Sequence, residues 1–258
     1  MKHIIVTLPL VPLRAAADER AEMVSQLLFG EMAEVLDTSK KWLKIRNLAD
    51  NYVGFADRKM LTVLSENAFE FQKNLYAVKT SVPVTTIYNV ENQPIIVPFG
   101  STLWLDNKDI CFVNNEKYFY DAAQIVGLAP FTMQDITHNA KKFLNAPYLW
   151  GGKSVFGIDC SGLVQLIFAN FNVRLPRDTT QQVTQGTQIP AISVARQGDL
   201  AFFENEDGKI IHVGILLNNR QIIHSSGSVK IENVDENGII SAQTNEYTHK
   251  LAEIRRIF

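Results

Sequence analysis

The amino-acid sequence predicts an α+β protein whose first half is built of β-strands. Three observations predict this class. Up to about residue 130 the chain alternates short apolar, β-branched runs with turn-forming residues. Next come a stretch with helical apolar spacing, a glycine-rich loop and a second apolar helix. From Gly198 onward the sequence reads as strands again. Helices followed by an antiparallel sheet are typical of α+β domains.

Eight runs of strand length stand in the first half. They are MAEVLD, WLKIRN, NYVGFA, PVTTIYNV, PIIVPF, STLWLD, DICFVN and KYFYDA. Many short strands with frequent turn signals are typical of small barrels or sandwiches. One series of strands ends at GFADRKMLTVL and a second ends at YDAAQIVGLAP. We therefore expect two small all-β domains, residues 1–64 and 65–129, and a third domain over 130–258 that begins at Pro130.

The third region is expected to hold two helices and then four strands. Apolar residues recur with a helical period over 132–144, and Thr132 is placed to cap that helix. The segment CSGLVQLIFANF is mostly apolar, which is typical of a buried helix. The expected strands are GDLAFFEN, KIIHVGILL, RQIIHSSG and KLAEIRRIF.

Composition limits the class of function. The formal net charge is −2, which gives no reason to expect a nucleic-acid partner. No segment approaches the roughly 20 apolar residues that a membrane span needs. Two cysteines exclude a disulfide framework, and the usual four-ligand Cys/His zinc spacing is absent. The sequence therefore predicts a globular protein that binds neither nucleic acid nor the membrane interior.

The N-terminal apolar stretch resembles a signal peptide only in part. It carries Lys2 and small residues at 15–17, but Pro9 and Pro12 interrupt it and Arg14 follows. A signal peptide needs an uninterrupted apolar segment at this point. We therefore expect strand structure over 3–13 and a cytoplasmic location, with export to the periplasm or cell wall as the alternative.

Cys160 is the candidate nucleophile. It follows a glycine-rich loop and begins the apolar helix, within the polar triplet Asp159-Cys160-Ser161. Unpaired amides and the helix dipole at such a position favour the thiolate, which is the reactive form. Cys111, inside the apolar run ICFV, is expected to be buried and inert.

His212 and His224 stand in two successive predicted strands joined at Asn218-Asn219. A short hairpin would place the two histidines nearly opposite each other, on one face of the sheet. A base bonded to a second polar group is what nucleophilic catalysis needs. A zinc site formed by the two histidines and Cys160 is the alternative, although no fourth ligand is evident.

The other three histidines lack such a context. His138 is expected on a helix surface, and His3 and His249 are expected to be structural or solvated.

Six short motifs give the last region a resemblance. They occur in the order YLWGG, DCSG, PRDT, GDL, HVG and IHSS, over most of residues 130–258. Together they resemble the NlpC-type cell-wall cysteine peptidases. The resemblance implies a papain-like α+β domain that cleaves the bond between γ-D-glutamate and an L-diamino acid in peptidoglycan stem peptides. It implies that the enzyme needs no metal and no cofactor.

The resemblance also assigns roles to residues. Cys160 is the nucleophile, His212 the base and His224 the third polar residue, and Tyr148 helps to position the oxyanion or the substrate. The substrate groove would be lined by Asp159, Ser161, Asp178 and Thr179. Many relatives have serine where this chain has Thr179.

The first half resembles a bacterial SH3-like domain in VPLRAAADERAEMVSQLLFGEMAEVLD, WLKIRN and YVGFADRKML. Residues 65–129 would be a second, divergent copy. Two SH3-like barrels before the peptidase resemble the dipeptidyl-peptidase branch, which releases L-Ala-γ-D-Glu from murein stem peptides with a free N-terminal L-Ala. In that branch the first barrel helps to hold the amine, for which Glu31 and Tyr52 are the candidates here.

Three other functions remain open at this point. One is an exported endopeptidase that acts on intact peptidoglycan, and another is a wall-binding SH3-like protein with weak catalysis. The third is an amidase or transferase on a related cysteine fold. The products formed from a defined stem peptide distinguish them.

Overall fold

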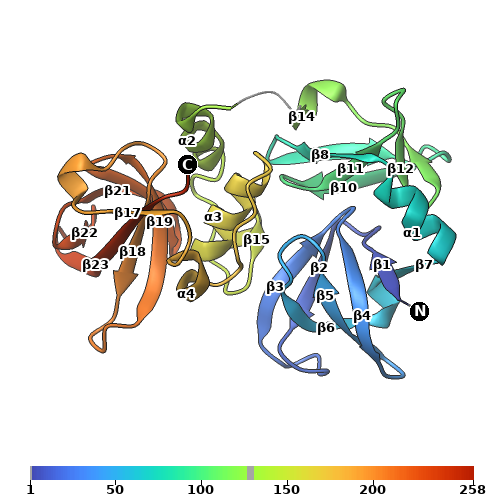
Figure 1. Cartoon of the computed structure of the whole chain (residues 1–258), viewed down its shortest axis with the longest axis horizontal. Helices are drawn as coiled ribbons and strands as arrows, with labels where there is room; N and C mark the ends of the chain where they lie inside the picture. Colours follow the sequence, from blue (N-terminus) through green and yellow to red (C-terminus); the bar gives the residue numbers. More distant parts are fainter. Residues whose placement is uncertain (1, 127–130) are drawn as a thin grey trace. The chain divides into compact units, whose positions relative to one another are not determined.

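The computed structural model describes residues 2–126 and 131–258 (Figure 1). Packing divides the chain into two units. Unit 1 comprises Met1–Ala129 with Trp150–Val155, and unit 2 comprises Pro130–Leu149 with Phe156–Phe258. The domain boundary expected at Pro130 lies outside the described residues.

Unit 1 opens with a seven-stranded sheet and one 3-10 turn, η1 (Arg58–Met60). Its strands are β1 (His3–Ile5), β2 (Leu10–Arg14), β3 (Met23–Leu28), β4 (Met32–Thr38), β5 (Trp42–Asn47), β6 (Val53–Asp57) and β7 (Thr62–Leu64). The order in space is β3-β2-β6-β5-β4-β1-β7. Residues 3–5 and 10–14 are strands, as expected, because Ile4, Val11 and Leu13 alternate into the core of this sheet.

The second part of unit 1 adds a five-stranded sheet in the order β13-β12-β11-β8-β14 and a separate β9–β10 pair. The elements are α1 (Glu66–Lys73), β8 (Tyr76–Thr80), β9 (Val84–Tyr88), β10 (Pro94–Pro98), β11 (Thr102–Leu105), β12 (Cys111–Val113), β13 (Glu116–Tyr118), η2 (Ala122–Gln124) and β14 (Ile125–Val126).

Helix α1 was not expected, since the sequence analysis read this region as all β. Ser65 caps it by accepting a hydrogen bond from the amide of Ala68, and only Ala68 and Gln72 on it are buried. An eight-residue helix with so few buried side chains leaves almost no periodic signal.

The two parts of unit 1 share a hydrophobic core. Ile5 and Met32 from the first sheet, and Phe29 from the turn after β3, pack in one cluster with Val78 and Leu103 from the second sheet. Residues on both sides of position 65 therefore belong to one packed body.

Residues 150–155 belong to unit 1, although they lie in the sequence of the third region. The short strand β15 (Lys153–Ser154) contacts β3. The Lys153 amide donates to Oε1 of Gln26 at 2.7 Å, and the indole of Trp150 donates to Oε1 of Glu22 at 2.5 Å.

Unit 2 combines short helices with a larger sheet. Its elements are α2 (Met133–Lys141), β16 (Gly157–Ile158), α3 (Cys160–Ala169), α4 (Thr179–Gln182), β17 (Thr187–Ile189), η3 (Ile192–Val194), β18 (Leu200–Glu204), β19 (Ile210–Asn218), β20 (Gln221–Ser226), β21 (Ser228–Val234), β22 (Gly238–Ile240) and β23 (Tyr247–Arg256). The sheet order is β17-β23-β18-β19-β20-β21-β22. Because β22 also pairs with β23, six strands close into a ring. The α+β class with strands dominating is confirmed.

Helices α2 and α3 lie beside the sheet at β19 (Figure 1). Thr132 and Asp135 form a capping box at the start of α2, as expected for Thr132. Nine residues of α3 are buried, because this apolar helix packs against both α2 and the sheet. This packing holds the first residue of α3, Cys160, against β19.

Candidate active site

Cys160 is the first residue of α3 and is almost fully buried. Asp159 caps the helix by accepting a hydrogen bond from the amide of Gly162 at 2.6 Å. The Cys160 thiol accepts hydrogen bonds from the amides of Val213 and Ser161. Val213 follows His212 in β19, so the packing of α3 brings the thiol next to the strand that carries the candidate base.

Burial has a larger effect on the pKa of the thiol than the helix start has. Desolvation raises the pKa of Cys160 to about 11, and the nearby charge of Asp159 adds to the increase. The two amide bonds and Arg177 lower the pKa by less. The amides at the helix start favour the thiolate, as expected, but burial outweighs them, because an almost enclosed sulfur loses the hydration of its charged form. The resting thiol is protonated and needs a base.

His212 and His224 are nearly opposite, as expected, but form a diagonal pair and are not directly paired. Gly214 pairs with His224, and His212 pairs with Phe203 on the other side of β19. An offset of two residues keeps both histidines on one face of the sheet, as expected. Nε2 of His212 lies 2.9 Å from Nδ1 of His224, and the two rings are nearly perpendicular.

The environment of His212 favours its neutral form. Its pKa lies well below 6.5, first because the ring is buried and then because electrostatic interactions with His224, His249 and Lys230 oppose its protonation. A neutral imidazole has a free lone pair and can accept a proton.

Glu232 on β21 was missed by the sequence analysis. Its Oε2 lies 2.9 Å from Nε2 of the fully buried His224. The hydrogen bond from His224 is the main reason that the pKa of Glu232 falls to about 2. The signal was a glutamate inside the strand VKIENV, but only the pairing of β20 with β21 places it beside His224.

His249 on β23 also lies at the cluster, so of its two expected roles, structural or solvated, the structure favours the structural one. Its ring centroid lies 4.3 Å from that of His212, and its pKa is lowered to about 4, mainly by burial. No local pattern marks this residue, because β23 reaches the site only through its pairing with β18, the neighbour of β19. His138 is exposed on α2, as expected, and His3 stacks on Phe69 in unit 1.

Asp159 and Ser161, two expected groove residues, are joined to a buried arginine. The Arg177 guanidinium donates to Oδ2 of Asp159 at 2.6 Å, to its Oδ1 at 3.0 Å and to Oγ of Ser161 at 2.8 Å. Sequence analysis missed Arg177, although it stands inside the PRDT motif. Its network fixes the loop that carries Cys160.

Tyr148 is close enough to Cys160 and Asp159 for both groups to raise the pKa of its phenol. Burial raises the pKa of its phenol to about 12, so the hydroxyl stays protonated and can donate a hydrogen bond. Asp178 is the residue before α4, and Thr179 begins that helix. Both are partly exposed.

Glu31 and Tyr52 lie in unit 1. The Glu31 carboxylate is buried and accepts a hydrogen bond from the amide of Leu28, and its Oε1 lies 3.5 Å from Nζ of the buried Lys153. Tyr52 packs against the core of the first sheet. Cys111, in the same unit, is buried with a pKa raised to about 12, as expected for an inert thiol.

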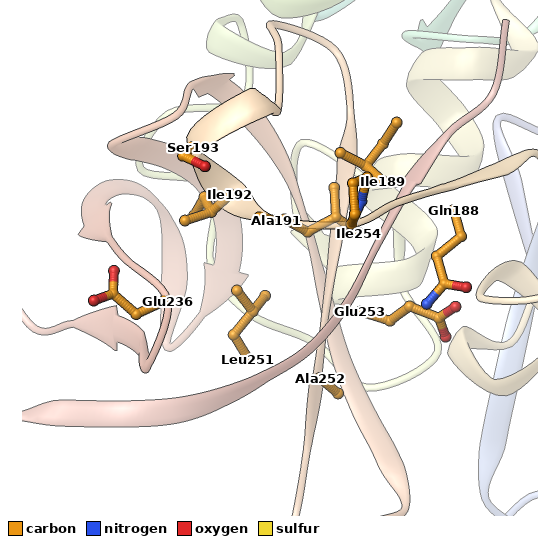
Figure 2. Close-up of a pocket in the computed structure, with 11 residues that line it drawn as sticks. Gln188, Ile189, Ala191, Ile192, Ser193, Glu236, Leu251, Ala252, Glu253 and Ile254 are labelled. Atoms are coloured by element: carbon orange, nitrogen blue, oxygen red, sulfur yellow. The ribbon is translucent and has the colours of Figure 1, made fainter.

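A pocket of about 430 Å³ lies elsewhere on unit 2 (Figure 2). Its lining is formed by Gln188, Ile189, Pro190, Ala191, Ile192, Ser193, Glu236, Leu251, Ala252, Glu253 and Ile254. None of these is a residue to which the sequence assigned a role.

Two features are absent from residues 2–126 and 131–258. No group of three or more His, Cys, Asp and Glu side chains has an arrangement that could hold a metal ion. Within the same residues, no helix combines the length and the apolar composition that a membrane crossing requires.

The sequence profile of the NlpC/P60 family matches residues 145–248, and that of the bacterial dipeptidyl-peptidase Sh3 domain matches 13–61. The γ-D-glutamyl-L-lysine dipeptidyl-peptidase of Bacillus subtilis is 38% identical to the chain, over 91% of this chain and 81% of its own length. The chain belongs to the NlpC/P60 family. The Bacillus cereus protein of the same name is 26% identical, over 91% of this chain and 75% of its own length.

A solved NlpC/P60 family protein from Bacillus cereus has the same fold, with a TM-score of 0.86, 21% identity and 99% coverage of both chains. Membership of the NlpC/P60 family makes this chain a cysteine peptidase, which is a hydrolase. The NlpC/P60 profile spans the motifs with Cys160, His212 and His224.

Proposed function

We propose that this chain hydrolyses the bond between γ-D-glutamate and an L-diamino acid in murein stem peptides and releases L-Ala-γ-D-Glu. The observation that carries the proposal is the 2.9 Å contact between Nε2 of His212 and Nδ1 of His224, on the strand whose Val213 amide donates to the Cys160 thiol. The two dipeptidyl-peptidase relatives, which match the chain over both units, support the choice of bond.

The first half of the reaction transfers the acyl group to Cys160. His212 takes the thiol proton while the sulfur attacks the γ-carbonyl carbon of D-glutamate, and the carbonyl π electrons move to oxygen. This oxyanion accepts hydrogen bonds from the backbone amide at the start of α3 and from the phenol of Tyr148. His212 then gives its proton to the leaving amine of the diamino acid, which leaves a thioester.

The second half releases the dipeptide. A water molecule attacks the thioester carbon as His212 takes one of its protons, and the second tetrahedral intermediate expels the Cys160 sulfur. The proton on His212 returns to the sulfur. The neutral His212 and the protonated thiol of the resting site support a mechanism in which proton transfer accompanies attack.

The remaining sequence predictions complete the proposal. Residues 1–64 and 65–129 would be SH3-like barrels, and 130–258 a papain-like domain. The Sh3 profile at 13–61 supports the first barrel. Asp159, Ser161, Asp178 and Thr179 would bind the substrate, and Glu31 and Tyr52 would bind the ammonium of L-Ala.

The test is incubation with L-Ala-γ-D-Glu-L-Lys and with the diaminopimelate counterpart, followed by mass spectrometry. We expect L-Ala-γ-D-Glu and the free diamino acid as products. The N-acetylated peptide and intact peptidoglycan should be cut poorly. Cys160→Ala should abolish the reaction, and Cys111→Ala, at the inert thiol, is the matched control. Equal cleavage of the N-acetylated and free peptides would make the chain an endopeptidase.

A further inference from the structure

Glu232 is a buried carboxylate to which the proposed acyl-transfer steps give no role. Its two oxygens have different partners. Oε2 lies 2.9 Å from Nε2 of His224, whereas Oε1 accepts from the amide of Ala242 at 3.1 Å and lies 3.4 Å from Nζ of Lys230. Both carboxylate oxygens therefore have partners, and Oε2 contacts only the histidine among the groups named here.

The contacts form an unbroken chain from Glu232 to the candidate base. Oε2 of Glu232 meets Nε2 of His224, and Nδ1 of His224 meets Nε2 of His212 at 2.9 Å. All three side chains are buried, so water does not compete for these bonds. In each histidine the proton position on one nitrogen decides what the other nitrogen can do.

An ionised carboxylate can only accept hydrogen bonds. Its pKa near 2 keeps Glu232 ionised at neutral pH, so Nε2 of His224 must carry hydrogen. In a neutral His224, Nδ1 is then an acceptor and takes the hydrogen on Nε2 of His212. Nδ1 of His212 is consequently the nitrogen with a free lone pair.

We propose that Glu232 is a positioning residue that fixes both histidine tautomers, so that His212 presents Nδ1 as the base toward Cys160. This rests on the proposed function for its effect on catalysis, but the tautomers themselves do not depend on any substrate. Glu232 also stabilises the positive charge that His212 gains during attack, because only the His224 ring separates the carboxylate from His212.

Three further charged or titratable groups lie near the chain of contacts formed by Glu232, His224 and His212. Lys230 on β21 contacts Oε1 of Glu232, and His249 on β23 packs against His212. The Cys160 thiol lies at the other end. Lys230 and His249 both lower the pKa of His212, whereas the contact of Nε2 of His224 is with the Glu232 carboxylate.

Nitrogen-15 NMR of the histidine rings in the whole protein is the direct test. In the wild type we expect His212 and His224 both protonated on Nε2. Finding His224 protonated on Nδ1 alone would overturn the proposal without any variant. This measurement stands even if the peptide proves to be the wrong substrate, so failure of the proposed function and failure of this inference are distinguishable.

Glu232→Gln is the matched variant, since an amide can donate as well as accept and no longer selects one tautomer. We expect kcat to fall at least tenfold with KM changed less than threefold, since general-base catalysis is worth about 10²–10⁴-fold. Alkylation of Cys160 by iodoacetamide should slow in parallel. Glu232→Asp, which keeps the charge, should recover part of kcat.

Glu253→Gln is the control. Glu253 stands in the same sheet, pairs with Arg255 and lines the separate pocket (Figure 2), so this variant should keep wild-type kcat. A Glu232→Gln enzyme that unfolds at the wild-type temperature yet keeps kcat within twofold would overturn the proposal. If that variant does not fold, Lys230→Met and Glu232→Asp take its place. Lys230→Met should preserve both tautomers, and Glu232→Asp should lower kcat. Changed tautomers in Lys230→Met together with an unchanged kcat in Glu232→Asp would contradict the role of Glu232.

Discussion

Single residues control the protonation of this site, and burial is the largest effect on the thiol and the base. Desolvation is the main reason that the pKa of Cys160 rises to about 11 and that the pKa of His212 falls below its usual value. The two shifts act in opposite directions on an acid and a base. They leave a neutral thiol and a neutral imidazole, which is the starting state that proton transfer during attack requires.

Replacing His249 should move the pH profile of catalysis. The His249 ring helps to bury His212 and lowers its pKa, so His249→Ala should raise that pKa. The neutral, active form of His212 is lost as pH falls through its pKa, so the acid limb of kcat/KM should move to higher pH. His138→Ala, on the exposed face of α2, should leave the limb in place. If the acid limb of His249→Ala stays in place or moves to lower pH, His249 does not lower the pKa of His212.

Replacing Arg177 should destabilise the protein. Its guanidinium is buried and makes two hydrogen bonds with the buried Asp159. Arg177→Met leaves that carboxylate without its cation, which costs about 3–5 kcal/mol in the free energy of unfolding. Urea denaturation measures the change. Arg174→Met, at an exposed neighbouring position, should lower stability little. Equal stability of the two variants would show that Asp159 does not depend on Arg177.

At the scale of elements, the two-residue offset between β19 and β20 shapes the histidine pair. Gly214 occupies the position directly opposite His224, so the ring of His224 can extend toward His212. A Cβ built on Gly214 would lie 2.6 Å from Cδ1 of Ile222 and 2.9 Å from Cβ of His224. The bare backbone at this position makes room for the contact between the two rings.

Gly214→Ala should therefore displace His224 and lower kcat. Overpacking of this kind costs about 1–3 kcal/mol in stability, and a shift of about 1 Å in a catalytic group can cost about 10²-fold in rate. Steady-state kinetics and thermal unfolding measure the two effects. The double variant Gly214→Ala/Ile222→Val removes the closest clash and should recover part of both. Full activity in Gly214→Ala would mean that the strands adjust without moving the ring.

At the scale of the whole molecule, the segment 150–155 crosses from the peptidase sequence into unit 1. The Lys153–Glu31 ion pair in this segment is almost fully buried. It gives Glu31 a partner that the sequence did not reveal. Glu31 therefore has a structural role in addition to its proposed role in binding the substrate ammonium.

Breaking that ion pair should destabilise unit 1. Glu31→Gln and Lys153→Met each leave one buried charge unpaired, which costs about 3–5 kcal/mol. The double variant leaves neither charge and should be more stable than Glu31→Gln alone. Comparing KM for the free peptide among the three variants separates substrate binding from folding. If KM rises in Glu31→Gln and in the double variant but not in Lys153→Met, the proposed contact with the substrate amine is supported. Equal KM values in all three would contradict it.

Local sequence patterns were sufficient for most strands, for helices α2 and α3 and for the placement of Cys160, His212 and His224. These features depend on periodicity and on motif order within short segments. Helix α1 escaped because it is short and mostly polar. The grouping of 150–155 with unit 1 could not be predicted, because contacts between distant segments leave no periodic pattern in the sequence.

By itself, then, the sequence determined the α+β class, the position of Cys160 at a helix start and the pair of histidines on one sheet face. Only the tertiary structure decided that Glu232 lies behind His224, that His249 covers His212 and that the Cys160 thiol is protonated at rest. The physical reason is that strand pairing and register bring remote side chains together, and burial sets their charge. Neither can be read from neighbours along the chain.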